Sequence, residues 1–322
     1  MEMAYKLDLK DRKILYELDL DCRQSCSQIG KKVGLSTDVV NYRIKKLEEE
    51  KIITQYQLIV NLAKLGIIQF KLCLGFHHLT SEKLEEMIEK LKKKEEVKWI
   101  VSCNGNWDML ISLEVDSLSR IDELENEILE IFEIYVKKKE LSIAVKASTF
   151  NRDYLIDKKQ IIKERTILDS SKKVKIDELD IEIIKKLAQN ARKSIVDIAV
   201  ELRRSPRVIN YRIKQLLKEK IIEGFRIAIN YDKLGVKFFK TFIYLDRVNE
   251  QELKEFRYFF FNNRNIIHNM QVIGAWDFEP EFEVYSEEEF NHLISDMKDK
   301  FANIIGNIEI ITISKEHKFV YF

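Results

Sequence analysis

Cysteine is scarce in this 322-residue chain, and its four thiols belong to Cys22, Cys26, Cys73 and Cys103. Four cysteines confined to the first half are too few for a disulfide framework in a chain of this length. Cys22 and Cys26 can share one face of a helix, but neither a second cysteine pair nor a neighbouring histidine completes a tetrahedral zinc set. We therefore expect free thiols, no metal site and no cofactor.

Long apolar runs are also missing. No stretch of about 18 uncharged apolar residues occurs, and the start, MEMAYKLDLKDRK, has no apolar core of the kind that a signal peptide needs. Hydrophobic residues nevertheless make up 45% of the chain, enough for two or more domains with their own cores. We expect a folded cytoplasmic protein with no membrane partner.

A large net charge is absent too, since the formal balance is only +1, but the positive charge is unevenly placed. Residues 1–66 carry 12 Lys and Arg against 10 Asp and Glu, and residues 175–235 carry 14 against 9. These balances of +2 and +5 leave −6 for the remaining residues. Two separate basic segments favour two contact regions for a polyanion.

The most informative feature is an internal repeat, in a constant register that places Asp180 on Asp11. STDVVNYRIKKLEEEKII at 36–53 recurs without a gap as SPRVINYRIKQLLKEKII at 205–222. The same register relates Asn61 to Asn230 and the glycine–tryptophan–aspartate segment of 105–108 to that of 274–277. One register over so long a span indicates two copies of a two-domain unit.

Each unit begins with a pattern typical of three helices. Asp11 and Asp180 are expected to cap the first helix, and Ser25 and Ser194 precede the second. Gly34-Leu35 then predicts a tight turn into the third helix. In the second copy Arg203-Arg204 takes this place, which indicates a less strained bend.

The third helix is expected to begin at Ser36 and Ser205, with Pro206 at its favoured first position. Its buried stripe is predicted at Val40, Ile44 and Leu47, and at Ile209, Ile213 and Leu216. The opposite face is rich in Asn, Tyr, Arg and Lys, which suits base edges and phosphates, although such charges can also merely solvate a three-helix bundle. The residues predicted to bind DNA are Ser36, Thr37, Asn41, Tyr42, Arg43, Lys45 and Lys46 in the first copy, and Arg203, Arg204, Ser205, Arg207, Asn210, Tyr211, Arg212 and Lys214 in the second.

The rest of each unit alternates as β-α-β-β-α-β, the ferredoxin-like order. Residues 52–60 and 221–229, between the helices and this pattern, are expected to be extended and to form the wing of each unit. A sheet covered by helices on one side leaves its other face open, so two such domains are expected to pair.

The fold class predicted is therefore α+β, with two tandem copies of a winged helix-turn-helix domain followed by a ferredoxin-like domain. The winged domains are expected at 1–61 and 176–230, and the ferredoxin-like effector and assembly domains at 62–151 and 231–322. The charged segment 152–175, which lacks Gly and Pro, is interpreted as a partly ordered linker long enough to let the halves dock.

With both halves laid out, nearly the whole chain resembles a tandem form of the Lrp/AsnC, or feast/famine, family. The resemblance is carried in the first copy by Leu7-Asp8-x-x-Asp11, Ser36, Arg43-Ile44-x-x-Leu47, Ile52-Ile53, Asn61, Leu65-Gly66 and Gly105-x-Trp107-Asp108, and by their counterparts in the second copy. It implies transcriptional regulation, binding of double-stranded promoter DNA through the third helix, and a C-terminal domain that dimerises and can bind an amino acid.

One chain then supplies both halves of what is normally a dimer, as an internal pseudo-dimer with higher homo-oligomers left open. We predict contact with two half-sites about 34–36 Å apart, or a multiple of that. The second head is expected to contribute more phosphate contact, because Arg203, Arg204 and Arg207 replace Gly34, Leu35 and Asp38.

The resemblance also marks two turns near which effector and assembly contacts cluster. They comprise Gly105, Asn106, Trp107 and Asp108 in the first copy, and Gly274, Ala275, Trp276 and Asp277 in the second. The same residues suit a tight turn in which glycine permits the bend and tryptophan fills the core, and we favour that structural role.

The second copy departs from the pattern at Phe278-Glu279-Pro280-Glu281-Phe282-Glu283. Pro280 removes a donor from an expected central strand, which predicts a bulge. The alternating glutamates are interpreted as a solvated face, with repulsion of an amino-acid carboxylate as the alternative; either way the pattern makes an effector pocket in this half doubtful.

Two other classes compete with the regulator. Sirohaem decarboxylases resemble the same arrangement, and His268-Asn269 falls near a place where they carry His-Asn, but the adjoining aromatic and arginine pattern is missing. The five histidines, His77, His78, His268, His292 and His317, form no set repeated in both halves, so we expect no enzyme. An architectural DNA-compacting protein is disfavoured by the modest net charge.

Overall fold

A computed structural model of the chain describes residues 6–156, 164–169, 172–246 and 248–320. Each copy begins with three helices and a strand. In the first copy these are α1 (Leu9–Leu20), α2 (Cys26–Val33), α3 (Thr37–Glu49) and β1 (Ile53–Val60). In the second they are α7 (Glu178–Gln189), α8 (Ile195–Glu201), α9 (Pro206–Lys218) and β7 (Ile222–Ile229).

The first helix of each unit is capped differently from the expectation. Asp8 accepts from the backbone N–H of Asp11 at 2.8 Å, and the Asp11 carboxylate accepts in return from the N–H of Asp8. Asp177 and Asp180 repeat this capping box. Asp11 and Asp180 are therefore the third helical residues that close the box, and the caps lie three residues earlier.

The stripe predicted for the third helix is buried in both copies. Its six side chains, Val40, Ile44, Leu47, Ile209, Ile213 and Leu216, are at most 5% exposed. They belong to one continuous core that includes both three-helix units.

The strand after each third helix finds its partner in the other copy. β1 and β7 pair antiparallel, with Tyr56 opposite Ile227 and Leu58 opposite Phe225, as a separate two-stranded ribbon. Both segments are extended, as expected, and each pairs with the matching strand of the other copy. Each head also docks on the other copy's strand, because the N–H of Cys22 donates to the carbonyl of Phe225 and that of Ala191 to Tyr56.

The ferredoxin-like order is present in both copies. The first has β2 (Ile68–Phe76), α5 (Ser81–Lys92), β3 (Val97–Asn104), β4 (Met109–Val115), α6 (Leu118–Phe132) and β5 (Val136–Thr149). The second has β8 (Lys237–Leu245), α11 (Glu250–Asn262), β9 (Ile266–Ile273), β10 (Glu281–Val284), α12 (Glu287–Lys300) and β11 (Ile305–Phe319). Short helices α4 (Leu62–Leu65) and α10 (Tyr231–Leu234) join these domains to the ribbon.

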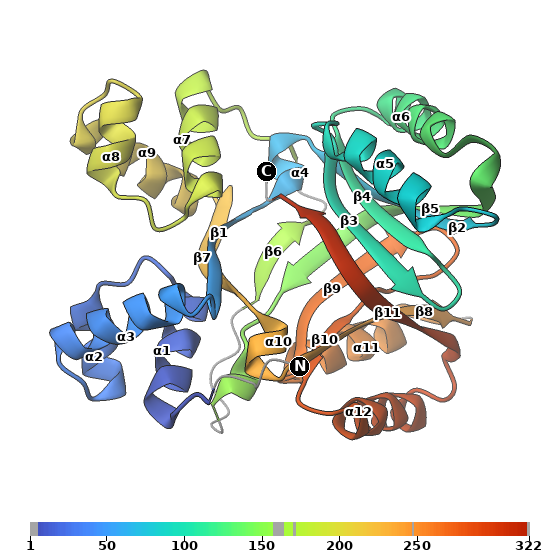
Figure 1. Ribbon diagram of the computed structural model, residues 1–322. Helices are drawn as coiled ribbons and strands as arrows, with labels where there is room; N and C mark the ends of the chain where they lie inside the picture. Colours follow the sequence, from blue (N-terminus) through green and yellow to red (C-terminus); the bar gives the residue numbers. More distant parts are fainter. Residues whose placement is uncertain (1–5, 157–163, 170–171, 247, 321–322) are drawn as a thin grey trace.

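The two domains share one sheet, in the order β2-β4-β3-β11-β8-β10-β9-β5-β6. Because β5 also pairs with β2, the strands from β2 to β5 in that order close into a ring. The long strands β5 and β11 make the two junctions, since each pairs first within its own copy and then with the other. Helices cover the outside of the ring (Figure 1). Trp107, Trp276 and Phe242 belong to one buried apolar cluster with residues of both copies.

The interruption predicted at Pro280 is present. Strand β10 begins only at Glu281, Phe278 makes isolated bridges, and the pairing of β10 with β9 shifts register between Glu281 and Phe282. The expected linker, 152–175, contains a short 3₁₀ turn (Asp153–Leu155) and strand β6 (Arg165–Leu168), which pairs with β5. Its residues 157–163 and 170–171 lie outside the described residues, and the domain boundaries stay predictions.

Candidate DNA-binding faces and a central cavity

The outer face of α3 is open to solvent in the first head. Ser36 caps the helix, and Thr37, Asn41, Tyr42, Lys45 and Lys46 are all exposed, Tyr42 by 66%. Tyr42, Lys45 and Lys46 come from the side of the helix away from the buried stripe, and Thr37 and Asn41 from its first turns. The face therefore combines an amide, a phenol and ammonium groups that can reach a nucleic acid.

The face of α9 repeats this arrangement with more arginine. Its exposed residues are Arg203, Arg204, Ser205, Arg207, Tyr211 and Lys214, and Asn210 is half-buried. Arg203 has a φ of +53°, close to the +68° of Gly34 at the matching position. The expectation of a less strained bend is therefore wrong, because an arginine adopts the left-handed conformation that glycine adopts more easily.

Arg43 and Arg212 differ from the rest of the predicted face. Arg43 Nη1 lies 2.7 Å from Asp8 Oδ2 and 2.8 Å from Asp11 Oδ1, and Arg212 is paired in the same way with Asp177 and Asp180. Each guanidinium thus ties the third helix to the capping box of the first. This pairing favours a structural role for both arginines over contact with DNA.

Both three-helix units lie on the same side of the molecule, one on each side of the β1–β7 ribbon (Figure 1). The sheet ring and its outer helices lie on the other side of the ribbon. The heads are therefore held by one pair of strands rather than by a flexible tether.

The side chains at the two glycine-containing turns mostly serve the fold. Trp107 and Trp276 are 7% and 2% exposed. Asp108 Oδ2 accepts from the N–H of Phe76 at 2.6 Å, and Asp277 Oδ2 accepts from that of Leu245 at 2.7 Å. The exposed members of the two turns are Gly105, Asn106, Asp108, Gly274 and Ala275. These turns thus offer an effector backbone groups, one amide side chain and a carboxylate that already accepts a hydrogen bond, and the effector role stays a prediction.

The two glycines are required for different reasons. Gly105 has a φ of +122°, which L side chains rarely adopt. Gly274 has no such φ, but a Cβ there would lie 3.0 Å from the carbonyl oxygen of Leu141 and 3.1 Å from the Cα of Ser142. One turn therefore needs glycine for its backbone conformation and the other for the close approach of β5.

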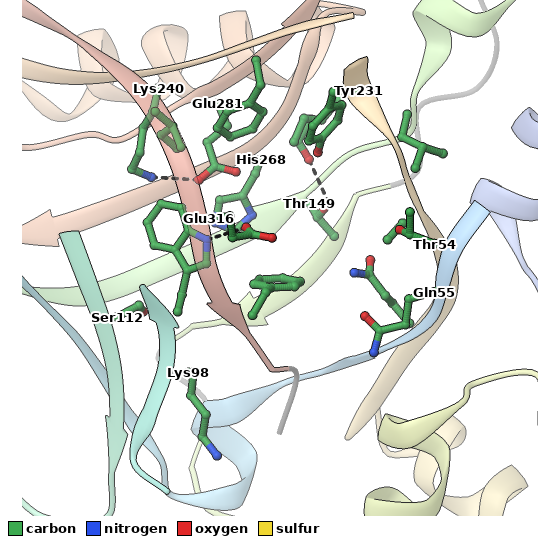
Figure 2. Close-up of a pocket in the computed structure, with 18 of the residues that line it drawn as sticks. Thr54, Gln55, Lys98, Ser112, Thr149, Tyr231, Lys240, His268, Glu281 and Glu316 are labelled. Atoms are coloured by element: carbon green, nitrogen blue, oxygen red, sulfur yellow. Dashed lines mark hydrogen bonds and ion pairs between the residues drawn. The ribbon is translucent and has the colours of Figure 1, made fainter. Parts of the chain in front are cut away.

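A cavity of about 1170 Å³ lies between the β1–β7 ribbon and the sheet ring. Figure 2 shows Thr54 and Gln55 on the ribbon side, and Lys240, Glu281, His268, Ser112 and Lys98 on strands across from them. Residues of both copies line it, as do the ends of β5 and β11. This cavity could not be predicted from the sequence, because its ribbon wall is made by strands from different copies.

Beside the cavity lies a buried cluster of four charges. Lys71 and Lys240, which occupy the same position in the two copies, both contact the carboxylate of Glu279, and Lys240 Nζ lies 2.9 Å from Glu281 Oε1. Glu279 also accepts from the indole N–H of Trp276 at 2.9 Å. Burial alone would raise the pKa of Glu279, but Lys71 and Lys240 lower it to about 2. The interpretation of these glutamates as a solvated face is therefore wrong.

A second buried cluster fixes the first head to the sheet. Asp19 of α1 accepts from Arg152 Nη1 at 2.6 Å and from Arg226 Nη2 at 2.8 Å. Arg152 also pairs with Glu283 of β10, at 2.8 Å from its Nε. The second head has Ala188 at the position that matches Asp19, so this anchor exists on one side only.

The comparisons with known proteins agree with the two heads. The family described as "Winged helix-turn-helix DNA-binding" matches residues 7–54 and again 176–223. The transcriptional regulator LrpA of Pyrococcus horikoshii is 37% identical over 100 residues, which are 31% of this chain and 70% of LrpA. The regulator Ptr1 of Methanocaldococcus jannaschii is 32% identical over 117 residues, 35% of this chain and 78% of Ptr1.

This chain belongs to the Lrp/AsnC family. The expected recognition and fold class are confirmed, with the helix-turn-helix of the family present twice. The arrangement of the two halves matches a crystal structure of the sirohaem decarboxylase NirDL, with a TM-score of 0.63 over 97% of this chain and 93% of that one. At 15% identity this match shows the shared fold alone.

Within this member of the Lrp/AsnC family, two of the five histidines, His268 and His317, line the cavity, and His77 and His78 lie together with ring centroids 5.0 Å apart. His268 opens onto the cavity, and its pKa is lowered to about 4 by burial and by Lys240 and Lys71, against the opposing effect of Glu281. Among the described residues there is no group of three His, Cys, Asp or Glu side chains that could hold a metal, and no helix long and apolar enough to cross a membrane.

The family pattern could not reveal Asp19, Arg152, Arg226 and the two buried lysines. The strongest signal available was the pair Lys71 and Lys240, a charged residue kept at the same repeat position within otherwise apolar strands. Buried lysines need carboxylates as counter-charges, and the sequence contains Glu279, Glu281 and Glu283 as candidates.

Proposed function

We propose that this chain is a sequence-specific DNA-binding transcriptional regulator that reads two half-sites with two unequal heads. The observation that supports this most directly is that the two heads lie on one side of the molecule and that their third helices carry exposed Tyr and Lys, and Asn, at matching positions. Asn41 and Asn210 can pair with adenine, and Lys45 and Lys214 can reach guanine or phosphate.

The two heads are proposed to contribute unequally to DNA affinity. The first is anchored through Asp19, and the second carries Arg203, Arg204 and Arg207 around its turn and helix start. Arginines at a helix N-terminus suit the phosphate backbone. We therefore assign more sequence-independent affinity to the second head.

Binding to a library of selected duplexes at stated salt concentrations tests this proposal. We expect enrichment of a site with two half-sites, and reduced affinity for Lys45→Ala and Lys214→Ala. Lys93→Ala is the matched control, because Lys93 is exposed at the end of α5, far in the sequence from either head. If the protein retains no duplex at low ionic strength, the regulator assignment fails.

A decarboxylase is the second candidate, and the position of His268 on a large cavity is the observation that favours it. The NirDL structures include a complex with an iron-uroporphyrin III analogue. In this chain the repeat position of His268 is occupied by Trp99, so the two copies do not contribute a matched pair of histidines, and the other histidine of the cavity lining is His317. Incubation with a sirohaem-type tetrapyrrole, monitored by its absorption spectrum, distinguishes the decarboxylase from the regulator. A spectrum that stays unchanged over many hours supports the regulator alone.

A further inference from the structure

The cavity between the ribbon and the sheet ring is much larger than the amino-acid effector that the family resemblance implies. Binding pockets for drug-sized molecules measure roughly 300–1,000 Å³. At about 1170 Å³ this cavity exceeds that range, and a single amino acid would leave most of it to water. It therefore has room for a ligand considerably larger than an amino acid.

The walls of the cavity include aromatic side chains and a lysine. Trp99 and Phe319 line it, and the Trp99 indole is held in place by donating its N–H to Glu316 Oε2 at 2.8 Å. Lys98, labelled in Figure 2, makes no ion pair within 4 Å in the described part of the chain, and its nearest charge effect is on the buried carboxyl of Glu114, whose pKa is raised by burial and lowered by Lys98. Aromatic faces favour a ring system, and Lys98 favours an anionic substituent.

Lys240, the other lysine labelled in Figure 2, is not available to bind such an anion. Lys240 is already paired with Glu279 and Glu281, so its charge is compensated within the protein. His268, beside them, has no ring hydrogen bond among the described residues. It is thus available to donate or accept one hydrogen bond from a ligand.

We propose that this cavity binds a ring-bearing organic anion larger than an amino acid and is the effector site of the chain. Thr54 and Gln55 of β1, directly after the first head, form its ribbon wall, while Trp99, His268 and Lys98 belong to the sheet. A ligand that contacts both walls links the sheet to the β1–β7 ribbon and can thereby change the position of the attached heads. This regulatory part rests on the proposed DNA-binding function, and the binding part does not.

Titration of the full chain with anilinonaphthalene sulfonate, a ring-bearing anion whose fluorescence rises in apolar sites, tests the binding part. We expect saturation at one dye molecule per chain and a roughly tenfold weaker dissociation constant for Lys98→Ala, as for loss of one charged hydrogen bond. Thr54→Trp, which adds an indole at an exposed position of the ribbon wall, should also weaken binding. Lys93→Ala should bind like the unaltered chain.

Several outcomes would overturn the inference. The cavity is not the site if Lys98→Ala and Thr54→Trp bind the dye unchanged while circular dichroism shows both folded. The ligand class is wrong if millimolar free amino acids displace the dye. If the dye binds as expected but leaves affinity for a selected duplex unchanged, the effector role fails. If no duplex binds even without dye, the DNA-binding function fails and the cavity site stands.

Discussion

Lys240 Nζ lies 3.0 Å from Glu279 Oε2, and both side chains are at most 1% exposed. The repeat equivalent of this lysine, Lys71, contacts the same carboxylate from the other copy. One buried glutamate therefore contacts both lysines that the duplication placed on facing strands, and Glu281 supplies a second negative charge to Lys240. The copies are thus joined by charge as well as by apolar packing.

Replacing this glutamate should strongly destabilise the protein. Glu279→Gln keeps the volume but leaves the buried lysines undercompensated, so we expect a loss of about 3–5 kcal/mol in the free energy of unfolding. Urea denaturation followed by circular dichroism measures it. Glu287→Gln is the control, because the Glu287–Lys237 pair is exposed to solvent and should contribute little to the free energy of unfolding. Equal losses in the two variants would contradict this account.

Acid should destabilise the fold through Asp19 and Glu279. Burial favours the protonated form of Asp19, yet Arg226 and Arg152 lower its pKa to about 2, the same value as for Glu279. Since both folded pKa values lie below the ordinary values of 3.8 and 4.5, this stability is present above about pH 4.5 and is lost as the pH falls towards 2.

The expected loss is about 2–3 kcal/mol for each carboxylate over that interval. Urea titrations at a series of pH values from 5 down to about 2 measure this loss in the free energy of unfolding. The pH at which the loss occurs is compared with the ordinary pKa range of exposed carboxylates. A free energy of unfolding that stays constant across the interval would show that neither carboxylate is ionised in the folded protein in the way described.

Arg203→Gly should stabilise the second head. Arg203 adopts a φ of +53°, and relief of this left-handed conformation is worth about 1 kcal/mol. Thermal unfolding should therefore shift upward. Arg204→Gly, which removes the neighbouring arginine outside the left-handed region, should show no such gain. A fall in stability for Arg203→Gly would mean that its side chain contributes more than its backbone costs.

The unequal heads make different contributions to the salt dependence of DNA binding. Arg207→Ala should lower the slope of the logarithm of affinity against the logarithm of salt concentration by about one, as for one lost phosphate contact. Lys45→Ala should have a smaller effect on that slope. Our ranking of the heads is wrong if Arg207→Ala leaves affinity and slope unchanged while Lys45→Ala lowers both.

Arg43→Ala should act on stability rather than on DNA recognition. Its guanidinium already contacts Asp8 and Asp11, so the substitution should cost about 1 kcal/mol in the first head and leave the salt slope unchanged. Denaturation and DNA titration of the same preparation separate the two effects. A reduced slope with unchanged stability would instead make Arg43 a DNA contact.

The internal repeat was enough to predict the element order and the buried stripe of the third helix, because these depend on neighbours within one copy. The ribbon could not be predicted, since an apolar strand such as 53–60 suits a local wing as well as a distant partner. The alternating glutamates of β10 fit a solvated face equally well until their strand is placed between β8 and β9. Burial of charge is decided by partners far along the chain.

The pairing of β1 with β7 has a consequence for the order in which the protein forms. Tyr56 and Ile227 can meet only after more than half of the polypeptide has left the ribosome, and closure of a loop that long slows assembly. Until then the first head has a bare strand edge beside it, which another nascent copy could cover. Synthesis of both halves as one polypeptide keeps the proper partner at high local concentration when that edge is most vulnerable.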